Sequence, residues 1–420
     1  MLSVGHPHRT RRSWTIAVAF AIAAACESTV GPGADRSGAC ARTTATAGAL
    51  GIVGCGRITD RYTAELFVRG TTAYTTTWGR RDLARGNAIF IWDVSGDAPR
   101  LVDSVVVASG ATTLGDVAVS DDGRWLVVAA EPGPLSLIVY DLADPRRPVE
   151  LVRHSTGSGG HTAEIAAIDG RLHVFLAVYR SLSVVARLSV LDLGTPSQPR
   201  EVYALPFTTT FLHDTFHRDG ILFLSIWDEG LRILDVGGGG KGGTLTSPVP
   251  LGQILTVGGN VHNAWWFHDS QSGAKRYVFV GQEETTGLGI PIGSGGDIHV
   301  VDVTNMAAPR EVAFYRVAGA GTHNFSVDEQ RGILYAAYNN GGVRALDVRG
   351  DLGACTAAQK SADGRCDLAR MGRELAANLD ADLGVPGLDK PYIWGVHYES
   401  GHVYASDMVN GLWKLRAVTR

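Results

Sequence analysis

One short pattern recurs along most of the chain and restricts its fold more than any other feature. An apolar run with the character of a β-strand ends in Asp followed by Val or Leu, as between Leu231 and Val236. The pattern occurs six times, and its aspartates are Asp93, Asp141, Asp192, Asp235, Asp302 and Asp347. A seventh copy keeps the apolar run but has Arg416 in place of the aspartate. Several short strands in each unit, repeated about every 40–50 residues, indicate a β-propeller.

Each repeat also predicts the strands around this pattern. Upstream lies a hairpin signal, a polar residue followed by Gly between alternating apolar runs, as at Gly123 and Gly220. Downstream, four of the repeats have a turn containing Pro and then another strand. We expect each recurring aspartate to accept hydrogen bonds from the amides of the turn after its strand. The chain therefore predicts an all-β fold, a seven-bladed propeller of four-stranded antiparallel blades.

The ends of the repeat region carry two further expectations. The seventh repeat lacks a fourth strand, and the apolar segment 49–53 could supply it and so close the ring with both ends of the domain. The sixth repeat is followed by a long insert, residues 350–390, in which we expect a short helix over 368–379.

The repeated Leu-x-Ile-x-Asp-Val unit with its downstream Pro resembles the LVIVD repeat of exported bacterial and archaeal proteins. The resemblance covers about residues 60–418 and implies a β-propeller. It implies no particular activity, because that family has no common biochemical role and no catalytic residues to transfer.

Composition agrees with this architecture and excludes several alternatives. The 420 residues include 53 Gly, are 45% hydrophobic and only 19% charged, which disfavours disorder, a helical bundle and a coiled coil. Length alone suggests two or three domains, but the repeats argue for one. The net charge of -4 gives no indication of nucleic-acid binding.

The N-terminal residues predict export and lipid anchoring. Residues 1–25 have the form of a signal peptide, with three Arg followed by the apolar run from Trp14 to Ala25. Small residues before Cys26 resemble a bacterial lipobox, so we expect acylation of Cys26 and a lipid membrane as partner. Because Glu27 and not Asp follows, we expect the outer membrane. An ordinary secretory signal is the alternative, and both the Sec and Tat routes stay open. Residues 26–44 read as a flexible tether, and 45–420 as the propeller.

If the chain is exported, we expect its four remaining cysteines to form disulfides, because an oxidising compartment favours them. They are Cys40, Cys55, Cys355 and Cys366. Three pairings are possible, and we expect the two local ones, 40 with 55 and 355 with 366. A zinc site of four thiolates is the alternative, although no CxxC spacing supports it.

The first strand of each blade lines the channel of a propeller, and here these strands begin with polar residues. Aligning the repeats on the hairpin Gly places one group of such residues at the channel: Asp116, His161, His213, His262 and His323, with Trp394 in the last blade and Thr63 or Glu65 in the first. The loops between second and third strands bring Asp228, Glu283 and Asp407 to the same mouth. Four histidines with carboxylates could bind a divalent transition metal. The alternative is structural, since such residues can also cap the inner strand ends.

These observations favour a binding or scaffolding module that presents its channel face to a protein or small ligand. No nucleophile–base arrangement is present in the sequence, so no catalytic residue is nominated. The competing hypothesis is a metal-dependent enzyme, oxidase- or hydrolase-like, with its site at the His-lined mouth. We expect a monomer that does not bind nucleic acid.

Overall fold

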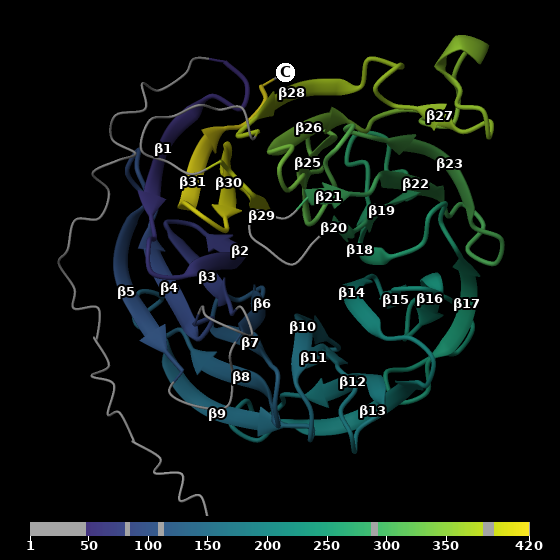
Figure 1. Cartoon of the computed structure of the whole chain (residues 1–420). Coiled ribbons are helices and arrows are strands. Elements are labelled where there is room, and N and C mark those ends of the chain that lie inside the picture. Colours follow the sequence, from purple (N-terminus) through teal and green to yellow (C-terminus); the bar gives the residue numbers. More distant parts are fainter. Residues whose placement is uncertain (1–47, 80–84, 108–112, 287–292, 381–389, 420) are drawn as a thin grey trace, which may run out of the picture. The chain divides into compact units, whose positions relative to one another are not determined.

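In a computed structural model the chain forms a seven-bladed β-propeller around a central channel (Figure 1). The structure describes residues 48–79, 85–107, 113–286, 293–380 and 390–419, which belong to one compact unit. Cys26, Cys40, the predicted signal peptide and the tether lie outside these residues. Among the described residues there is no helix with the length and apolarity needed to cross a membrane.

The first four blades follow the predicted order, each with four consecutive antiparallel strands from the channel outward. Blade 1 comprises β2 (Tyr62–Arg69), β3 (Thr72–Trp78), β4 (Ala88–Asp93) and β5 (Arg100–Val106). Blade 2 comprises β6 (Thr113–Val119), β7 (Trp125–Glu131), β8 (Leu135–Asp141) and β9 (Val149–Ser155). Blade 3 comprises β10 (Gly160–Ile168), β11 (Arg171–Val178), β12 (Ala186–Asp192) and β13 (Arg200–Phe207). Blade 4 comprises β14 (Leu212–Arg218), β15 (Ile221–Ile226), β16 (Gly230–Asp235) and β17 (Val249–Ile254).

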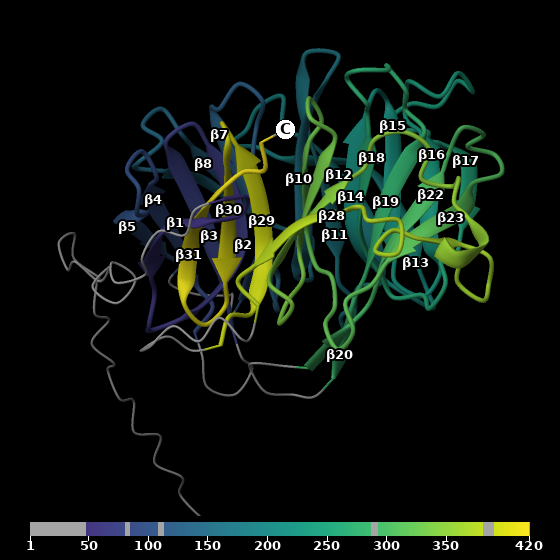
Figure 2. The same ribbon diagram turned by 90° about the horizontal axis from the view of Figure 1, so that it is seen from above.

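Blades 5 and 6 carry the additions to this plan. Blade 5 comprises β18 (Val261–Phe267), β19 (Tyr277–Gln282), β22 (Ile298–Asp302) and β23 (Arg310–Tyr315). A small hairpin of β20 (Glu284–Thr286) and β21 (Gly293–Gly295) interrupts it, and β20 projects from one face of the ring (Figure 2). Blade 6 comprises β24 (Phe325–Asp328), β25 (Ile333–Ala337), β26 (Val343–Asp347) and β28 (Glu374–Asn378).

Blade 7 is completed by the N-terminal side of the domain, as predicted. Its strands are β29 (Ile393–Glu399), β30 (His402–Asp407) and β31 (Gly411–Arg416), and β1 (Ile52–Arg57) pairs antiparallel with β31. The closing strand therefore begins three residues later than the apolar segment 49–53 suggested. Strands from the two ends of the described domain share one sheet, which leaves no open gap in the ring.

The insert lies within blade 6, between β26 and β28, and contains the predicted Cys355–Cys366 disulfide. Cys366 begins the two-residue strand β27 (Cys366–Asp367), which adds in parallel to β23 of blade 5. Cys55 is also disulfide-bonded. A single turn of 3-10 helix, η2 (Ala357–Gln359), lies between the two cysteines of the insert.

The helix predicted over 368–379 is wrong. Within that range Glu374–Asn378 forms β28, which pairs antiparallel with β26 and is the fourth strand of blade 6. The Leu- and Ala-rich sequence favours a helix by intrinsic propensity, but pairing with the free edge of β26 outweighs that weak preference.

The six recurring aspartates, called the outer aspartates below, stabilise the turns that follow the third strands. Each accepts a hydrogen bond from the backbone N–H two residues later: Ser95, Ala143, Gly194, Gly237, Thr304 and Arg349 are the donors, at 2.7–3.2 Å. This confirms the role expected for them and explains the strongest repeat signal in the sequence as a requirement of the fold.

Candidate functional site

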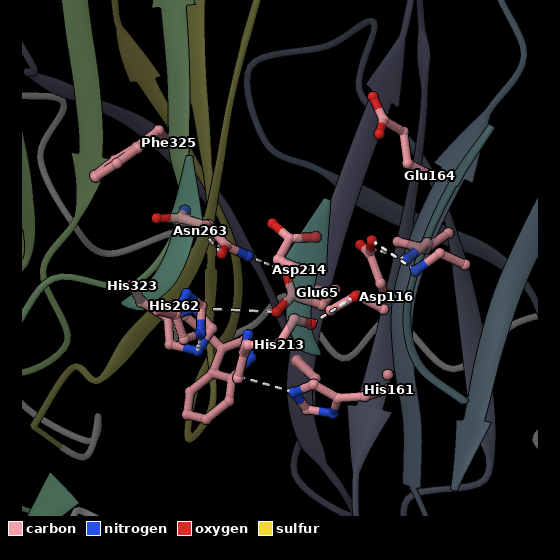
Figure 3. Close-up of a pocket in the computed structure, with 18 of the residues that line it drawn as sticks. Glu65, Asp116, His161, Glu164, His213, Asp214, His262, Asn263, His323 and Phe325 are labelled. Carbon is pink, nitrogen blue, oxygen red and sulfur yellow. Dashed lines mark hydrogen bonds and ion pairs between the residues drawn. The ribbon is translucent and has the colours of Figure 1, made fainter. Parts of the chain in front are cut away.

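A cavity of about 640 Å³ occupies the channel, and residues from all seven blades line it (Figure 3). The innermost strands supply most of this lining, and they run along the channel through the thickness of the ring (Figure 2). A cavity of this size is in the range that proteins use to enclose small molecules.

The innermost strands contain an irregularity that turns extra side chains into the cavity. In β14 the register shifts between Leu212 and Asp214, and in β18 it shifts between Val261 and Asn263. Comparable shifts occur at the corresponding place in β2, β6, β10 and β29. A bulge sets two residues against one on the neighbouring strand, so consecutive side chains need not alternate between faces. His213 and Asp214 therefore both line the cavity.

The four predicted histidines converge, and they are called the histidine cluster below. Nε2 of His161 lies 2.9 Å from Nε2 of His213, and Nε2 of His262 lies 3.1 Å from Nε2 of His323. The rings of His213 and His262 connect the two pairs, with centroids 4.0 Å apart. All four side chains are buried. His323 also packs on Trp394, which the alignment had placed at the channel.

The blade 2 position that corresponds to this cluster is occupied by Gly115, for a steric reason. A Cβ on Gly115 would lie 2.2 Å from the carbonyl oxygen of His161. The absence of a side chain lets blade 3 approach blade 2 closely, and the next residue, Asp116, reaches the cavity instead.

Three carboxylates lie beside the histidine cluster. Oε2 of Glu283 is 3.8 Å from Nε2 of His262, Oε2 of Glu131 is 3.4 Å from Nδ1 of His161, and Oε1 of Glu65 is 4.0 Å from Nδ1 of His323. Glu131, at the end of β7, was missed in the sequence. Its position at the end of a second strand corresponds to that of Glu283 directly after β19, and this was the available signal.

The histidines differ in their preferred protonation state. Burial and the neighbouring histidines lower the pKa of His213, His262 and His323 well below the usual value. Burial also opposes protonation of His161, but the carboxylates around it, Glu131 above all, outweigh that effect and raise its pKa. Burial raises the pKa of Glu283 to about 7.

A second group of acidic residues, called the carboxylate layer below, lies next to the histidines along the channel (Figure 3). It comprises Glu65, Asp116, Glu164 and Asp214, all partly exposed. Uncharged groups donate hydrogen bonds to it. Asp116 accepts from the backbone N–H of Val117 and Ala163, Glu164 from the backbone N–H of His217 and the hydroxyl of Thr215, and Glu65 from the side-chain amide of Asn324.

Acidic neighbours within this layer raise the pKa of Glu65, Glu164 and Asp214. Burial is the largest cause for each of them, and repulsion from Asp116 and Asp214 adds to it for Glu65 and Glu164. For Asp214, burial and the charge of Asp116 raise the pKa, against the opposing effect of the Thr215 backbone N–H. The raised pKa values favour the protonated forms of these carboxyls, and a cation bound among them would favour ionisation.

Aromatic side chains make up a large part of the remaining lining. Aromatic rings come from several blades: Phe67, Trp78, Tyr179, Phe211, Phe216, Trp227, Trp265, Phe325 and Trp394. Among the described residues that line the cavity there is no Lys and no Arg. The cavity thus combines aromatic side chains with several acidic side chains.

Two of the predicted loop ligands lie elsewhere. Asp228 is exposed and borders a separate surface hollow beside Arg180. Asp407 is fully buried, and it accepts hydrogen bonds from the backbone of Tyr392 and Val409 and from the side chains of Asn410 and Trp413. Burial, against these donors, raises the pKa of Asp407 to about 6. Its contacts are those of a residue that stabilises the loop after β30.

Comparisons with known proteins support the fold and add no family. No family model matches the sequence, and no curated protein matches it significantly. Among solved structures, the β-propeller domain of Cps50 (Swd1) from Myceliophteria thermophila is similar, with a TM-score of 0.55 and 13% sequence identity. The match covers 87% of this chain and 99% of that one. At this identity the likeness shows the propeller fold alone, and the LVIVD resemblance stays a prediction.

Proposed function

We propose that this protein is a binding module whose channel takes a small organic cation. One observation carries the proposal: a cavity of about 640 Å³ lined by five carboxylates, with no Lys or Arg among the described lining residues. The five are Glu65, Asp116, Glu164, Asp214 and Glu283. Like charges in a low-dielectric enclosure repel, and a bound cation removes that cost.

The aromatic residues that line the cavity support an organic cation over a bare inorganic ion as its ligand. Trp and Tyr faces attract ammonium groups, with an energy of about 0.5–2 kcal/mol for each favourable contact. Trp394 and Trp78 lie with ring centroids 5.3 Å apart, and Phe211 stacks on Trp227 with centroids 5.3 Å apart. Both pairs belong to the lining, and each packs on the histidine cluster, Trp394 on His323 and Trp227 on His213.

Calorimetry with a matched pair of probes tests this proposal. Choline and its neutral isostere 3,3-dimethyl-1-butanol differ chiefly in charge, so only choline is expected to bind saturably. Asp116→Asn together with Asp214→Asn should weaken choline binding at least about 10-fold, or about 1.4 kcal/mol. Glu150→Gln, on the exposed part of β9, is the control and should leave it unchanged. Equal affinity for both probes, or no binding of choline or of the diamine putrescine, would contradict the proposal.

We further propose that the propeller is an LVIVD-type lipoprotein anchored at the outer membrane through Cys26. The Arg-containing start, the apolar run and the small residues before Cys26 support this assignment. A Cys26→Ser variant should lose incorporation of radiolabelled palmitate and move to the soluble fraction. A variant that stays membrane-bound would exclude acylation of Cys26 as the anchor.

A further inference from the structure

We infer that the mouth of the channel binds one divalent transition metal ion through His213, His262 and Glu283. The inference concerns the same cavity as the organic cation and shares Glu283 with it, but His213 and His262 carry the metal site, and either proposal can hold without the other. It also narrows the ligand set expected from the sequence, because His161 and His323 take flanking positions.

Geometry carries the assignment. One donor atom from each of the three residues lies within 4.8 Å of the other two. Around a tetrahedral ion with bonds of about 2.1 Å, donor atoms are separated by about 3.4 Å. Small side-chain movements therefore suffice to bring these donors onto one ion. The three side chains come from different elements, β14, β18 and the residue before β20, so no single loop has to fold around the metal.

Burial makes the arrangement costly unless it has a ligand. His213, His262 and Glu283 are 6%, 3% and 7% exposed. The buried Nδ1 atom of His262 has no hydrogen-bond partner among the described residues. An unpaired buried polar atom costs on the order of 1–3 kcal/mol, and a ligand that pairs with the atom removes this cost.

The donor chemistry selects the class of metal. Two imidazoles and one carboxylate suit Zn²⁺, Fe²⁺ or Co²⁺ better than Mg²⁺ or Ca²⁺, which prefer oxygen ligands only. Three protein ligands also leave a coordination position free, and these residues line the cavity. A metal bound here would face whatever molecule the channel holds.

The flanking histidines have the contacts of groups that orient ligands. His161 touches His213 through Nε2, and its Nδ1 faces Glu131 at 3.4 Å. His323 touches His262 through Nε2, and its Nδ1 is 4.0 Å from Glu65. Carboxylate–histidine chains of this kind position metal-binding imidazoles in many sites, and losing one member typically lowers metal affinity 10–100-fold.

Metal titration of the full chain, first stripped with EDTA, tests the inference. Zn²⁺ is expected to bind with a stoichiometry of one per chain, and Co²⁺ to give visible d–d absorption bands. His213→Ala, His262→Ala and Glu283→Gln should each weaken Zn²⁺ binding at least about 100-fold. His217→Ala, on the same strand as His213 but stacked on Phe175 outside the cavity lining, is the matched control and should keep the wild-type affinity.

A second measurement avoids any dependence on variant folding. Zinc K-edge absorption of the loaded wild type should show two imidazole ligands and at least one oxygen ligand. Absence of saturable Zn²⁺ and Co²⁺ binding, or affinity unchanged in the three variants, would overturn the inference. Choline binding measured in the metal-free protein separates this outcome from failure of the proposed function.

Discussion

Acidic residues recur in two rings of this propeller, and the two rings behave in opposite ways. The outer aspartates end the third strands, and the pKa is lowered in four of them, Asp93, Asp192, Asp235 and Asp302. The carboxylate layer lines the channel, and the pKa of each of its members is raised. Burial occurs in both rings, so burial alone does not explain the difference.

The difference lies in the donors that each ring meets. Asp192 accepts hydrogen bonds from Arg171, Arg200 and the backbone N–H of Gly194. Asp214, in contrast, lies among other carboxylates in a cavity whose described lining has no Lys or Arg. The outer aspartates are therefore satisfied by the fold itself, whereas the carboxylate layer has acidic neighbours, and for this reason we propose a positively charged ligand for it.

The largest effect on stability is expected in the outer ring at Asp235. This carboxylate is 1% exposed and accepts hydrogen bonds from the backbone N–H of Gly237, Gly239, Lys241 and Gly243. Asp235→Ala leaves these turn amides without an acceptor and should cost about 3 kcal/mol or more in guanidinium unfolding. Asp214→Asn should cost less than about 1 kcal/mol, and similar losses in both variants would break the comparison.

Opposite pH dependence is the next expected difference between the rings. The pKa of Glu164 is raised in the folded chain, so the folded chain keeps a proton that the unfolded chain releases above about pH 4.5. Ionisation of Glu164 therefore lowers the stability of the folded chain as pH rises. Glu164→Gln should therefore gain stability over the wild type from about pH 4.5 upward.

Asp192 should show the reverse behaviour. Hydrogen bonds from Arg171 lower its pKa, so its contribution is present above about pH 3.8 and is lost as pH falls further. Asp192→Asn should be less stable than the wild type at neutral pH, and the difference should shrink below about pH 4. Unfolding free energies measured from about pH 2 to 8 test both predictions, and parallel curves for the two variants would refute the distinction.

The smallest loss of stability is expected at Asp141, an outer aspartate with fewer hydrogen-bond donors than Asp235. Its side chain is 21% exposed and has one backbone donor, Ala143, and one ion pair, with Arg124. An exposed pair of this kind contributes little, so Asp141→Ala should cost about 1 kcal/mol or less. A cost equal to that of Asp235→Ala would show that donor count does not set the effect.

The fold was largely predictable because its main signals are local. The outer aspartates and the hairpin glycines each satisfy a turn in their own blade, so they recur at each repeat. Ring closure was predictable because the seventh repeat lacks a fourth strand, which an apolar segment before the first repeat could supply. The strand β28 was not, because its sequence favours a helix and only the edge of β26 selects the extended form.

The candidate site was predictable in part. The alignment found the histidine cluster, because four blades place the same residue type at the same point. It could not show that Asp116 and Asp214 belong to one layer with Glu164, since bulges break the strand alternation on which such predictions depend. Asp228 and Asp407 failed to reach the cavity for another reason: loop orientation depends on contacts, such as those of Asp407 with Trp413, that no spacing reveals.

The central claim is that the carboxylate layer serves a ligand and not the fold. The most direct test is the unfolding free energy, at pH 7.5 and without added cation, of the variant that combines Glu65→Gln, Asp116→Asn and Asp214→Asn. Because the substitutions remove mutual repulsion and keep the side-chain shapes, we predict a stability equal to or above that of the wild type. A loss of more than about 2 kcal/mol would contradict the claim and assign these residues to the fold.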